Sequence, residues 1–292
     1  MRRVIKETKS LKWKNIIPFL SLLLLFVISD CSESTYYKDE EADWSFVAFG
    51  DLRQGFGVYS RLVDNMSHVK PLPQLALCGG DIMATTGNEV EWENFWRYSK
   101  PLTSKMPMYI ARGNHEGNSP ESDAIFREQT GIDTTCFYYS FTYNTARFIT
   151  LDTEIPGEVA SIGPEQFKWL KRELKSASEN DYIKYIFINM HRPLYAQGAH
   201  FGEDLHNADQ LHQLFLEHPK IKCVLVSHDH IYNRFEKDGI TYITSGGAGA
   251  PLHHGRGGDF YHFLIISVTE KTNTINVKTI GLFNEVVEDF DL

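Results

Sequence analysis

The sequence lacks the cysteine pairs that build a disulfide scaffold or a thiolate metal site. It has only four cysteines in 292 residues, and no two of them stand in a CxxC spacing. Cys78 and Cys223 lie inside the apolar runs "LALCGG" and "IKCVLVSH", where a free cysteine behaves as a small hydrophobic side chain. We therefore expect both to be core residues and exclude them as metal ligands.

An excess of basic charge is also absent. The chain has 29 Lys and Arg against 38 Asp and Glu, a formal net charge of -9. Bulk charge of this sign repels polyanions, so we expect no nucleic-acid partner, and an anionic substrate needs a local positive site. The enzyme motifs GxxxxGK[ST], GxSxG and HExxH are missing as well.

Long apolar runs are scarce as well, and the clearest is "NIIPFLSLLLLFVIS" at residues 15–29, which carries no charge and follows six basic residues. It is short for a membrane span and has the basic-then-apolar order of a secretory signal. The run ends in "ISDCSES", which resembles a bacterial lipoprotein signal with Cys31 as the lipidated residue. We expect residues 1–30 to be this signal and the protein to be exported and anchored in the bacterial cell envelope. A plain secreted protein or a single signal anchor is the alternative.

After a polar tether at residues 31–43, short apolar runs alternate with segments of helical periodicity, without an internal repeat or a further linker. The expected strands are residues 44–50, 75–78, 108–111, a hairpin within 136–152 that turns at Asn144 and Thr145, 182–189, 221–227, 240–245 and 260–268; the expected helices are 58–69, 89–98 and 163–177. This alternation predicts one layered α/β domain over residues 44–292, with antiparallel strands increasing toward the C-terminus.

Polar residues gather at the ends of five of these strands. The sequence reads GD at 50–51, GGD at 79–81, GNHE at 113–116, NMH at 189–191 and SHDH at 227–230. A single such residue is more often a turn or helix-cap residue. Ligands in α/β sheets gather at the carboxyl ends of strands, however, and isolated buried carboxylates and imidazoles are costly unless paired or metal-bound. Together the five loops predict a metal centre.

The donor types indicate which metals the centre would hold. The candidate ligands are Asp51, Asp81, Asn114, His191, His228 and His230. Carboxylate, amide and imidazole donors without thiolate fit Zn, Mn or Fe, whereas Ca or Mg would seldom take so many imidazoles. Six ligands are too many for one closed tetrahedral ion and suit two ions with open positions. Two such ions clamp the phosphate oxygens and activate a bridging water in phosphoryl transfer.

The ordered blocks "GDLR", "GDIM", "GNHE", "INMH" and "SHDH" resemble those of the calcineurin-like metallophosphoesterases. The stretches "INMHRPLYAQG" and "GPEQFKWLKREL" are most similar to purple acid phosphatases, whose extra N-terminal domain is absent here. The resemblance implies a β-sandwich of mixed sheets flanked by helices, in α/β/β/α layers. It also implies a hydrolase of small phosphorylated substrates, with phosphomonoesters favoured, that uses metal-bound hydroxide at two divalent or trivalent ions.

Matched by position, the resemblance implies roles for individual residues. Asp81 would bridge the two ions, Asn114, His191 and His228 would complete one site, and Asp51 and His230 would serve the other. His115 would donate a proton or hydrogen bond to the leaving group or a phosphate oxygen. The alternative for His115 is a histidine that only orients a ligand.

Two positions depart from the family pattern. Most members have a His two residues after the first Asp, and the purple enzymes have a Tyr three residues after the bridging Asp; this chain has Arg53 and Ala84 there. Neither side chain can coordinate a metal. We expect Arg53 to replace part of the lost metal charge or to form a bidentate contact with phosphate. The alternative is a structural ion pair with Asp51 or another nearby acid.

Two loops, "YAQGAHFGEDLH" and "GGAGAPLHHGRGGDF", are expected to cover the site. Their candidates for contact with phosphate or the leaving group are His200, His206, His253, His254 and Arg256, although histidines in exposed loops usually have no special role. Two other functions remain open. One is hydrolysis of phosphodiesters or nucleotides at the same site, and the other is a catalytically impaired binding protein with a depleted first metal position.

Overall fold

Strand β1 (Trp44–Phe49) is buried along its whole length. Phe46 and Ala48 belong to one apolar cluster, while Val47 and Phe49 belong to another on the opposite face. Because side chains alternate across a strand, a strand that is apolar at every position needs cover on both faces. A layer must therefore lie on each side of β1.

The computed structural model describes residues 36–37, 42–132, 135–254 and 257–292. The predicted signal peptide, Cys31 and Arg256 lie outside the described residues. Among the helices that the structure does describe, none is long and apolar enough to cross a lipid bilayer.

Among the described residues, twelve strands form two sheets of six. The first sheet contains β1, β2 (Leu75–Cys78), β3 (Met108–Ile110), β10 (His262–Thr269), β11 (Thr274–Gly281) and β12 (Val286–Asp291), in the order β12–β11–β10–β1–β2–β3. The second contains β4 (Tyr139–Tyr143), β5 (Ala146–Thr150), β6 (Tyr185–Asn189), β7 (Ile221–Val226), β8 (Tyr232–Lys237) and β9 (Ile240–Ser245), in the order β4–β5–β6–β7–β9–β8.

Each sheet combines a parallel centre with antiparallel strands at its edges. Strands β1, β2 and β3 are parallel, as are β5, β6, β7 and β9. The antiparallel pairs are β4–β5, β8–β9, β1–β10, β10–β11 and β11–β12. Since parallel strands end at the same edge, the loops after β1, β2 and β3 are neighbours, and so are those after β6 and β7.

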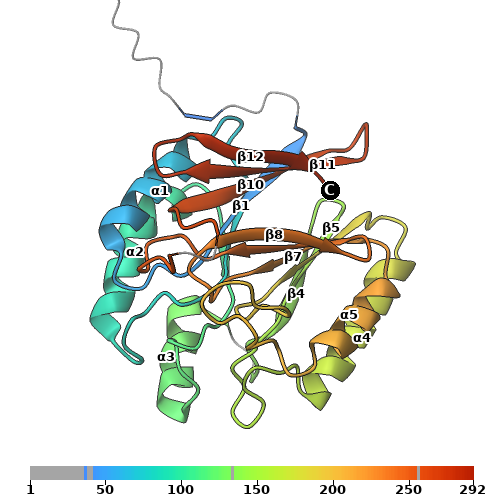
Figure 1. The fold of residues 1–292 in the computed structure, drawn as a ribbon, viewed down its shortest axis with the longest axis horizontal. Helices are drawn as coiled ribbons and strands as arrows, with labels where there is room; N and C mark the ends of the chain where they lie inside the picture. Colours follow the sequence, from blue (N-terminus) through green and yellow to red (C-terminus); the bar gives the residue numbers. More distant parts are fainter. Residues whose placement is uncertain (1–35, 38–41, 133–134, 255–256) are drawn as a thin grey trace, which may run out of the picture. The chain divides into compact units, whose positions relative to one another are not determined.

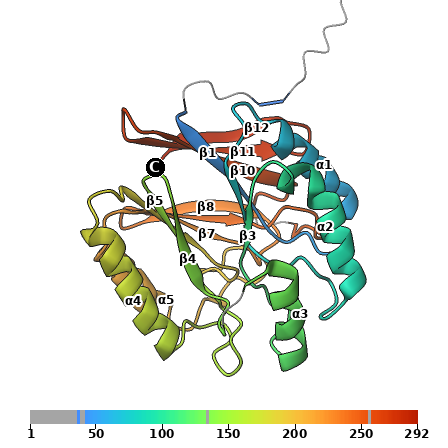
Figure 2. The same ribbon diagram turned by 180° about the vertical axis from the view of Figure 1, so that it is seen from behind.

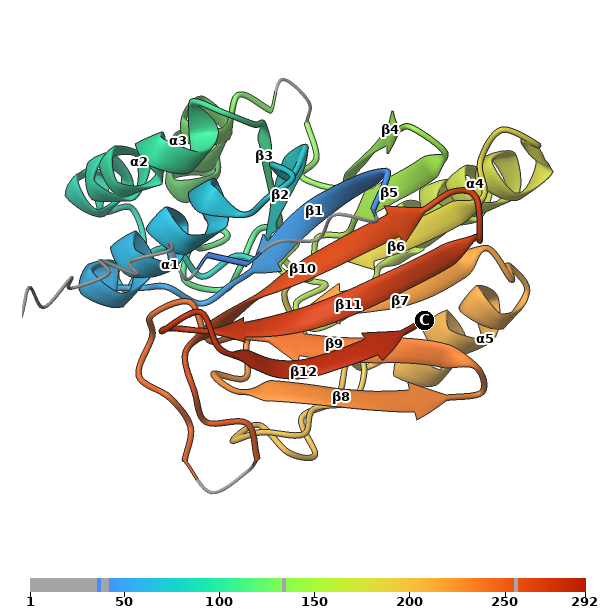
Figure 3. The ribbon, with the colours of Figure 1, turned by 90° about the horizontal axis from the view of Figure 1, so that it is seen from above.

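In the part of the chain that the structure describes, five helices cover the outer faces of the sheets: α1 (Phe56–His68), α2 (Glu89–Thr103), α3 (Pro120–Thr130), α4 (Pro164–Glu179) and α5 (Ala208–Leu216). Helices α1 to α3 pack on the first sheet and α4 and α5 on the second (Figures 1 and 2). A third apolar cluster fills the space between the sheets, where β10 to β12 lie across β7 to β9 (Figure 3). The predicted fold class, a layered α/β/β/α sandwich of mixed sheets, is confirmed.

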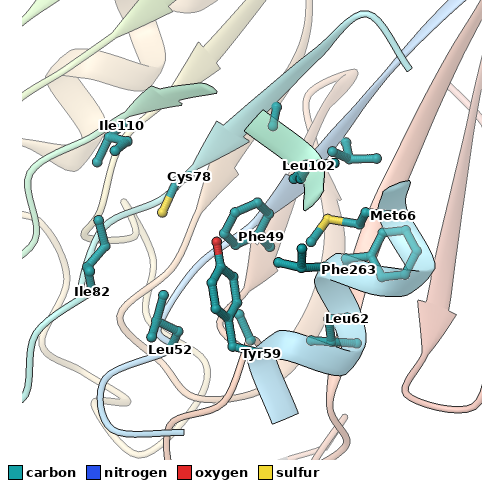
Figure 4. Close-up of a cluster of buried hydrophobic side chains, with 14 of the residues drawn as sticks. Phe49, Leu52, Tyr59, Leu62, Met66, Cys78, Ile82, Leu102, Ile110 and Phe263 are labelled. Atoms are coloured by element: carbon teal, nitrogen blue, oxygen red, sulfur yellow. The ribbon is translucent and has the colours of Figure 1, made fainter. Parts of the chain in front are cut away.

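The core under α1 shows how the helical pattern builds a layer. Tyr59, Leu62 and Met66 recur at helical spacing and pack against Phe49 (Figure 4). The Tyr59 hydroxyl lies 2.7 Å from Ser99 Oγ, so this buried polar group has a partner.

Cys78 lies in the same cluster, and Cys223 lies between the sheets. Both are buried free thiols, which confirms their expected place in the core. Burial raises the pKa of both thiols, so they remain protonated.

Several elements were not expected from the sequence, namely α3, α5, β8, β11 and β12. Helix α3 is missed because only Ser122 and Phe126 of it are buried, which leaves no apolar stripe to detect. It is instead defined by its N-terminus, where Ser119 and Ser122 form a capping box and Pro120 opens the helix. Helix α2 continues past the expected residue 98 to Thr103, because Pro101 is accommodated near its end.

His262, at the start of β10, is a buried imidazole with both ring nitrogens occupied. Its Nδ1 lies 2.9 Å from the Phe260 carbonyl oxygen, and its Nε2 lies 3.1 Å from Ser245 Oγ. Burial lowers the pKa of His262 to about 4 from the usual 6.5. The folded protein therefore holds this ring neutral in a pH range where the unfolded chain protonates it.

We predict that this difference makes the free energy of unfolding fall as the pH drops from about 6.5 to about 4, since only the unfolded state takes up the proton. Between pH 7 and pH 5, the free energy of unfolding of wild type should fall by about 2 kcal/mol more than that of a His262→Gln variant. Urea unfolding of both proteins at the two pH values measures this difference. Equal losses in the two proteins would contradict it.

Candidate metal centre

All six predicted ligands lie together where the two sheets meet. Asp51 follows β1, Asp81 follows β2, Asn114 follows β3, His191 follows β6, and His228 and His230 follow β7. Donor atoms of Asp81, His191 and His228 lie within 4.8 Å of one another, as do those of Asp51, Asp81 and His230. Asn114 joins the first group, with Oδ1 3.0 Å from His191 Nε2.

Glycines allow the loops of the two sheets to approach each other. A Cβ atom at Gly50 would lie 2.1 Å from Ser227 Oγ, and one at Gly79 would lie 2.0 Å from the same atom. Both distances are far below van der Waals contact, so only glycine fits at these positions. The glycines of the GD and GGD motifs therefore let the loops after β1 and β2 pack against the loop after β7.

Three of the six ligands have left-handed backbone conformations. The φ angles are 59° at Asp51, 53° at Asp81 and 71° at His228. Such angles cost a non-glycine residue about 1 to 3 kcal/mol, and they cluster at functional sites. These angles form tight turns after β1, β2 and β7, and the turns direct the three side chains into the centre.

We define position B by the side chains of Asp81, Asn114, His191 and His228. His191 Nδ1 lies 2.9 Å from the Gly79 carbonyl oxygen, so a neutral ring carries its proton there and has a lone pair at Nε2. This Nε2 faces Asn114 Oδ1 at 3.0 Å and Asp81 Oδ1 at 3.3 Å. Asn114 Oδ1 and Asp81 Oδ1 thus face the lone pair of His191 Nε2 in a buried space, where His228 Nδ1 at 3.1 Å can donate to that lone pair. A cation would satisfy all three acceptor atoms at once.

The spacing at position B also suits a metal ion. A tetrahedral ion with bonds of about 2.0 Å holds its ligand atoms about 3.3 Å apart. The atoms around His191 Nε2 lie 3.0 to 3.3 Å from it, including His228 Nδ1 at 3.1 Å. Burial and the neighbouring His191 lower the pKa of His228, which keeps the ring neutral, as the ring of a histidine ligand must be.

We define position A by the side chains of Asp51, Asp81 and His230. Asp51 Oδ2 accepts a hydrogen bond of 2.8 Å from the His228 backbone N–H, whereas its buried Oδ1 has no partner among the described residues. Burial and the nearby Asp81 carboxylate raise the pKa of Asp51. A bound cation would remove this cost, because it provides the missing partner and separates the two carboxylates.

His230 is oriented toward Asp51 by the loop after β9. Its Nδ1 lies 2.8 Å from the Pro251 carbonyl oxygen, which leaves Nε2 free at 3.9 Å from Asp51 Oδ1. Burial lowers the pKa of His230 to about 4, so the ring is neutral at neutral pH. Histidine ligands commonly donate their other N–H to a carbonyl oxygen in this way.

The donor set therefore fits Zn, Mn or Fe on the evidence of its own geometry. All oxygen donors come from the first sheet and all nitrogen donors from the second. The centre contains no cysteine, and its combination of carboxylate, amide and imidazole suits borderline divalent and trivalent ions.

The family model described as calcineurin-like phosphoesterase matches residues 27–232, which is more than half of the chain. The chain belongs to this family. The match confirms the resemblance in the five blocks, and it supports the expected class of phosphoric ester hydrolases.

Curated relatives are purple acid phosphatases. Purple acid phosphatase 21 of Arabidopsis thaliana is 28% identical over 193 residues, covering 59% of this chain and 43% of its own length. Probable inactive purple acid phosphatase 27 of the same plant is 28% identical over 240 residues, covering 69% and 38%. The chain thus spans less than half the length of these relatives.

A solved structure gives the same picture of the fold. The purple acid phosphatase PPD1 from seeds of yellow lupin (Lupinus luteus) superposes with a TM-score of 0.72 at 17% identity, covering 85% of this chain and 53% of that one. At this identity the likeness concerns the fold, and it agrees with the two-sheet sandwich described above.

Arg53 and His115 lie in contact with each other beside the centre. Arg53 is one of the two departures from the family pattern. His115 Nδ1 lies 2.9 Å from the Ala84 carbonyl oxygen, and Arg53 Nη2 contacts the Nε2 side of the ring. A guanidinium only donates, so a neutral His115 accepts at Nε2. His115 Nε2 also lies 3.9 Å from Asp81 Oδ2.

The alternative reading of Arg53 as a structural ion pair is wrong for the described part of the chain. No described carboxylate, that of Asp51 included, lies within salt-bridge distance of its guanidinium. Arg53 Nε is buried and has no hydrogen-bond partner among the described residues. The side chain therefore brings an unneutralised positive charge to the centre.

Glu116 was part of the GNHE block, but the sequence assigned it no role. Its buried carboxylate accepts hydrogen bonds from the backbone N–H groups of Asp81, Ile82, Met83 and Gly113, at 2.7 to 3.2 Å. Burial and the Asp81 carboxylate raise the pKa of Glu116. Glu116 ties the loop after β2 to the loop after β3 and so fixes the position of Asp81.

Arg192 was also missed. It forms a bidentate pair with Glu154, at 2.7 and 3.1 Å, and its Nη1 lies 3.2 Å from His228 Nε2. Because the guanidinium donates, a neutral His228 carries its proton on Nδ1 and hydrogen-bonds His191. Binding of a metal through Nδ1 requires the proton on Nε2, so the Arg192 Nη1 contact must then open.

The candidates from the two loops are placed differently from one another. The His200 ring stacks on His228 at 4.2 Å between centroids, and the His253 ring stacks on His230 at 4.3 Å. His254 is exposed and its Nδ1 lies 2.8 Å from Asp259. His206 lies in a separate depression beside Tyr195. The structure thus brings His200 and His253, but neither of the other two, into contact with the ligands.

The role of Glu116 leads to a prediction. Glu116→Gln keeps the shape of the side chain but turns an amide NH₂ toward backbone N–H groups, so about two of the four hydrogen bonds are lost. We expect the free energy of unfolding to fall by about 2 to 4 kcal/mol, measured by urea denaturation in the presence of a chelator. The control is Glu93→Gln, an exposed position on α2, and a loss no larger than that of the control would contradict the prediction.

Proposed function

We propose that the protein is a metal-dependent hydrolase of phosphate esters, with phosphomonoesters as the favoured substrates. The observation that supports this most strongly is the convergence of unprotonated donor atoms around His191 Nε2, next to the unpartnered Asp51 Oδ1. Membership of the phosphoesterase family and the acid phosphatases among the relatives agree with it.

The metal centre would be held by positions A and B. Ions of Zn, Mn or Fe there would supply a Lewis acid for phosphoryl oxygens and lower the pKa of a water molecule. We propose Asp81 as the shared ligand, with Asn114, His191 and His228 on one side and Asp51 and His230 on the other.

Arg53 and His115 would act on the substrate rather than on the metal. Arg53 has donors to offer a phosphate oxygen, and its charge is not already neutralised. The Nδ1 of His115 is fixed on the Ala84 carbonyl, so a protonated ring would present its second proton at Nε2 to the oxygen of the leaving group. The stacked rings of His200 and His253 lie where they can contact a bound anion, and we include them among the proposed substrate contacts.

A cavity beside the centre offers space for the leaving group. It has a volume of about 390 Å³ and is lined by Arg53, Gln54, Gly55, Ala84, Gly249, Pro251 and Tyr261. The small side chain of Ala84 leaves this space open. Arg53 is the only charged residue among the lining residues, which suits one anionic group attached to a mostly uncharged remainder.

One alternative is favoured by a specific observation, namely a protein that binds phosphate esters with little or no turnover. Position A has only three protein donors, because Arg53 and Ala84 replace residues that supply a ligand elsewhere in the family. One of the relatives of similar identity is named as probably inactive. The experiment that follows separates the two functions.

We predict that purified protein loaded with Zn, Mn or Fe hydrolyses an aryl phosphate, and hydrolyses an aryl phosphodiester more slowly. His191→Ala should reduce turnover by at least about a hundredfold, because it removes the donor at the middle of position B. The matched control is His68→Ala, at the end of α1, which should keep wild-type turnover.

Three other outcomes of this experiment would each lead to a different conclusion about the function. No hydrolysis with any of the three metals would favour the binding protein, and faster hydrolysis of the diester would favour a phosphodiesterase. Equal turnover by wild type and His191→Ala would remove the proposed centre from the reaction.

For the cell, we propose that the protein is exported and anchored in the bacterial envelope by a lipid on Cys31, as the basic and apolar order of residues 1–30 supports. Cys31→Ser removes the thiol to which the lipid would be attached. We predict that in a bacterial host it moves the protein from the membrane fraction to the soluble fraction, as measured by immunoblotting. Cys136→Ser is the control and should stay with the membrane, whereas unchanged fractionation of Cys31→Ser would argue against the anchor.

A further inference from the structure

The two metal positions differ in the number of protein donors. Position B combines one carboxylate, one amide oxygen and two imidazoles. The donor atoms of Asp81, Asn114 and His228 lie close to the fourth donor atom, His191 Nε2. Position A has two carboxylates and one imidazole, and one of those carboxylates, Asp81, is shared with position B. Four protein donors close a tetrahedral site, while three leave it incomplete.

The positions also differ in the positive charge beside them. Arg192 lies against His228 at position B, but Glu154 neutralises it through a bidentate pair. Arg53 lies beside position A and has no such partner among the described carboxylates. A fixed charge in a buried site acts strongly on any second cation there, because little water screens it.

The effect of Arg53 reaches the ligands of position A themselves. Arg53 stands two residues after Asp51, and its guanidinium contacts His115, whose Nε2 lies 3.9 Å from Oδ2 of the shared ligand Asp81. A fixed positive charge at this place stabilises the nearby carboxylates in the same way that a bound ion would. Arg53 thus already provides part of the positive charge that a metal at position A would bring.

We propose that the two positions are unequal, with position B the tight metal site and position A a weak one whose cation is partly replaced by the guanidinium of Arg53. This inference rests on the proposed metal centre, but it does not depend on the proposed reaction. Its consequence is that the protein holds one ion per chain at free metal concentrations that leave position A empty. Arg53 then stays available to an anion at the side of the cavity that it lines.

Metal binding at buffered free Zn²⁺ tests this inference directly. Equilibrium dialysis followed by elemental analysis gives the ions bound per chain across a range of free Zn²⁺. For wild type we expect one ion to bind first, and the second to bind only at free Zn²⁺ at least about tenfold higher. Filling of both positions over the same range would overturn the proposal.

Two substitutions separate the effect of charge from the effect of the missing donor. Arg53→Gln removes the charge without adding a strong ligand and should narrow the gap in free Zn²⁺ between the two binding steps by about threefold. Arg53→His removes the charge and adds an imidazole, so its gap should be narrower still. Histidine is also tolerated at the φ of 44° found at this position better than most residues are.

The control is Arg97→Gln on the exposed face of α2, which removes the same charge far from the ligands and should leave the gap unchanged. Circular dichroism in the presence of a chelator shows whether each variant is folded. A gap in both Arg53 variants equal to that of wild type would overturn the proposal. If the gap changes as expected but no protein hydrolyses any ester, the proposed function fails and the inequality of the two positions stands.

Discussion

The centre depends on one electrostatic constraint, which is that acceptor atoms face each other in a buried space. His191 Nε2, Asn114 Oδ1 and Asp81 Oδ1 point at one another, and the structure keeps them there by using the opposite side of each group. The Gly79 carbonyl holds the His191 ring and Pro251 holds His230, while the backbone N–H of His115 holds Asp81 Oδ1 at 2.9 Å. The arrangement is unfavourable by itself and favourable around a cation.

Most of the surrounding structure can be understood as support for this constraint. Three ligands accept left-handed backbone angles, two glycines allow the loops to touch, and Glu116 binds four backbone N–H groups to hold the loop of Asp81. Each of these features has a local cost, in strain, in chain entropy or in burial of a carboxylate. Two of the strands that precede these loops, β1 and β2, are buried along their whole length.

The sequence predicted the layers, and it also predicted a set of candidate ligands that the structure brings together, because both depend on local patterns. Apolar runs such as that of β1 mark buried strands, and a polar residue directly after such a run marks the functional edge of the sheet. Contacts between distant segments could not be predicted in this way. Arg192 meets Glu154, 38 residues away, and Glu116 reaches back to residues 81–83, so neither role follows from the residues beside it. The neighbour of Arg53 proved to be His115, 62 residues away, and not the adjacent Asp51.

The division of donors between the sheets has a mechanical consequence. Oxygen donors belong to the first sheet and nitrogen donors to the second, so an ion at either position is a cross-link between two layers that otherwise adhere through an apolar interface. The free energy of ion binding would then also stabilise the contact between the two sheets, by about 4 kcal/mol when the concentration of the free ion exceeds its Kd a thousandfold. Bound ions would therefore stabilise the interface between the two sheets from the edge where the proposed metal centre lies.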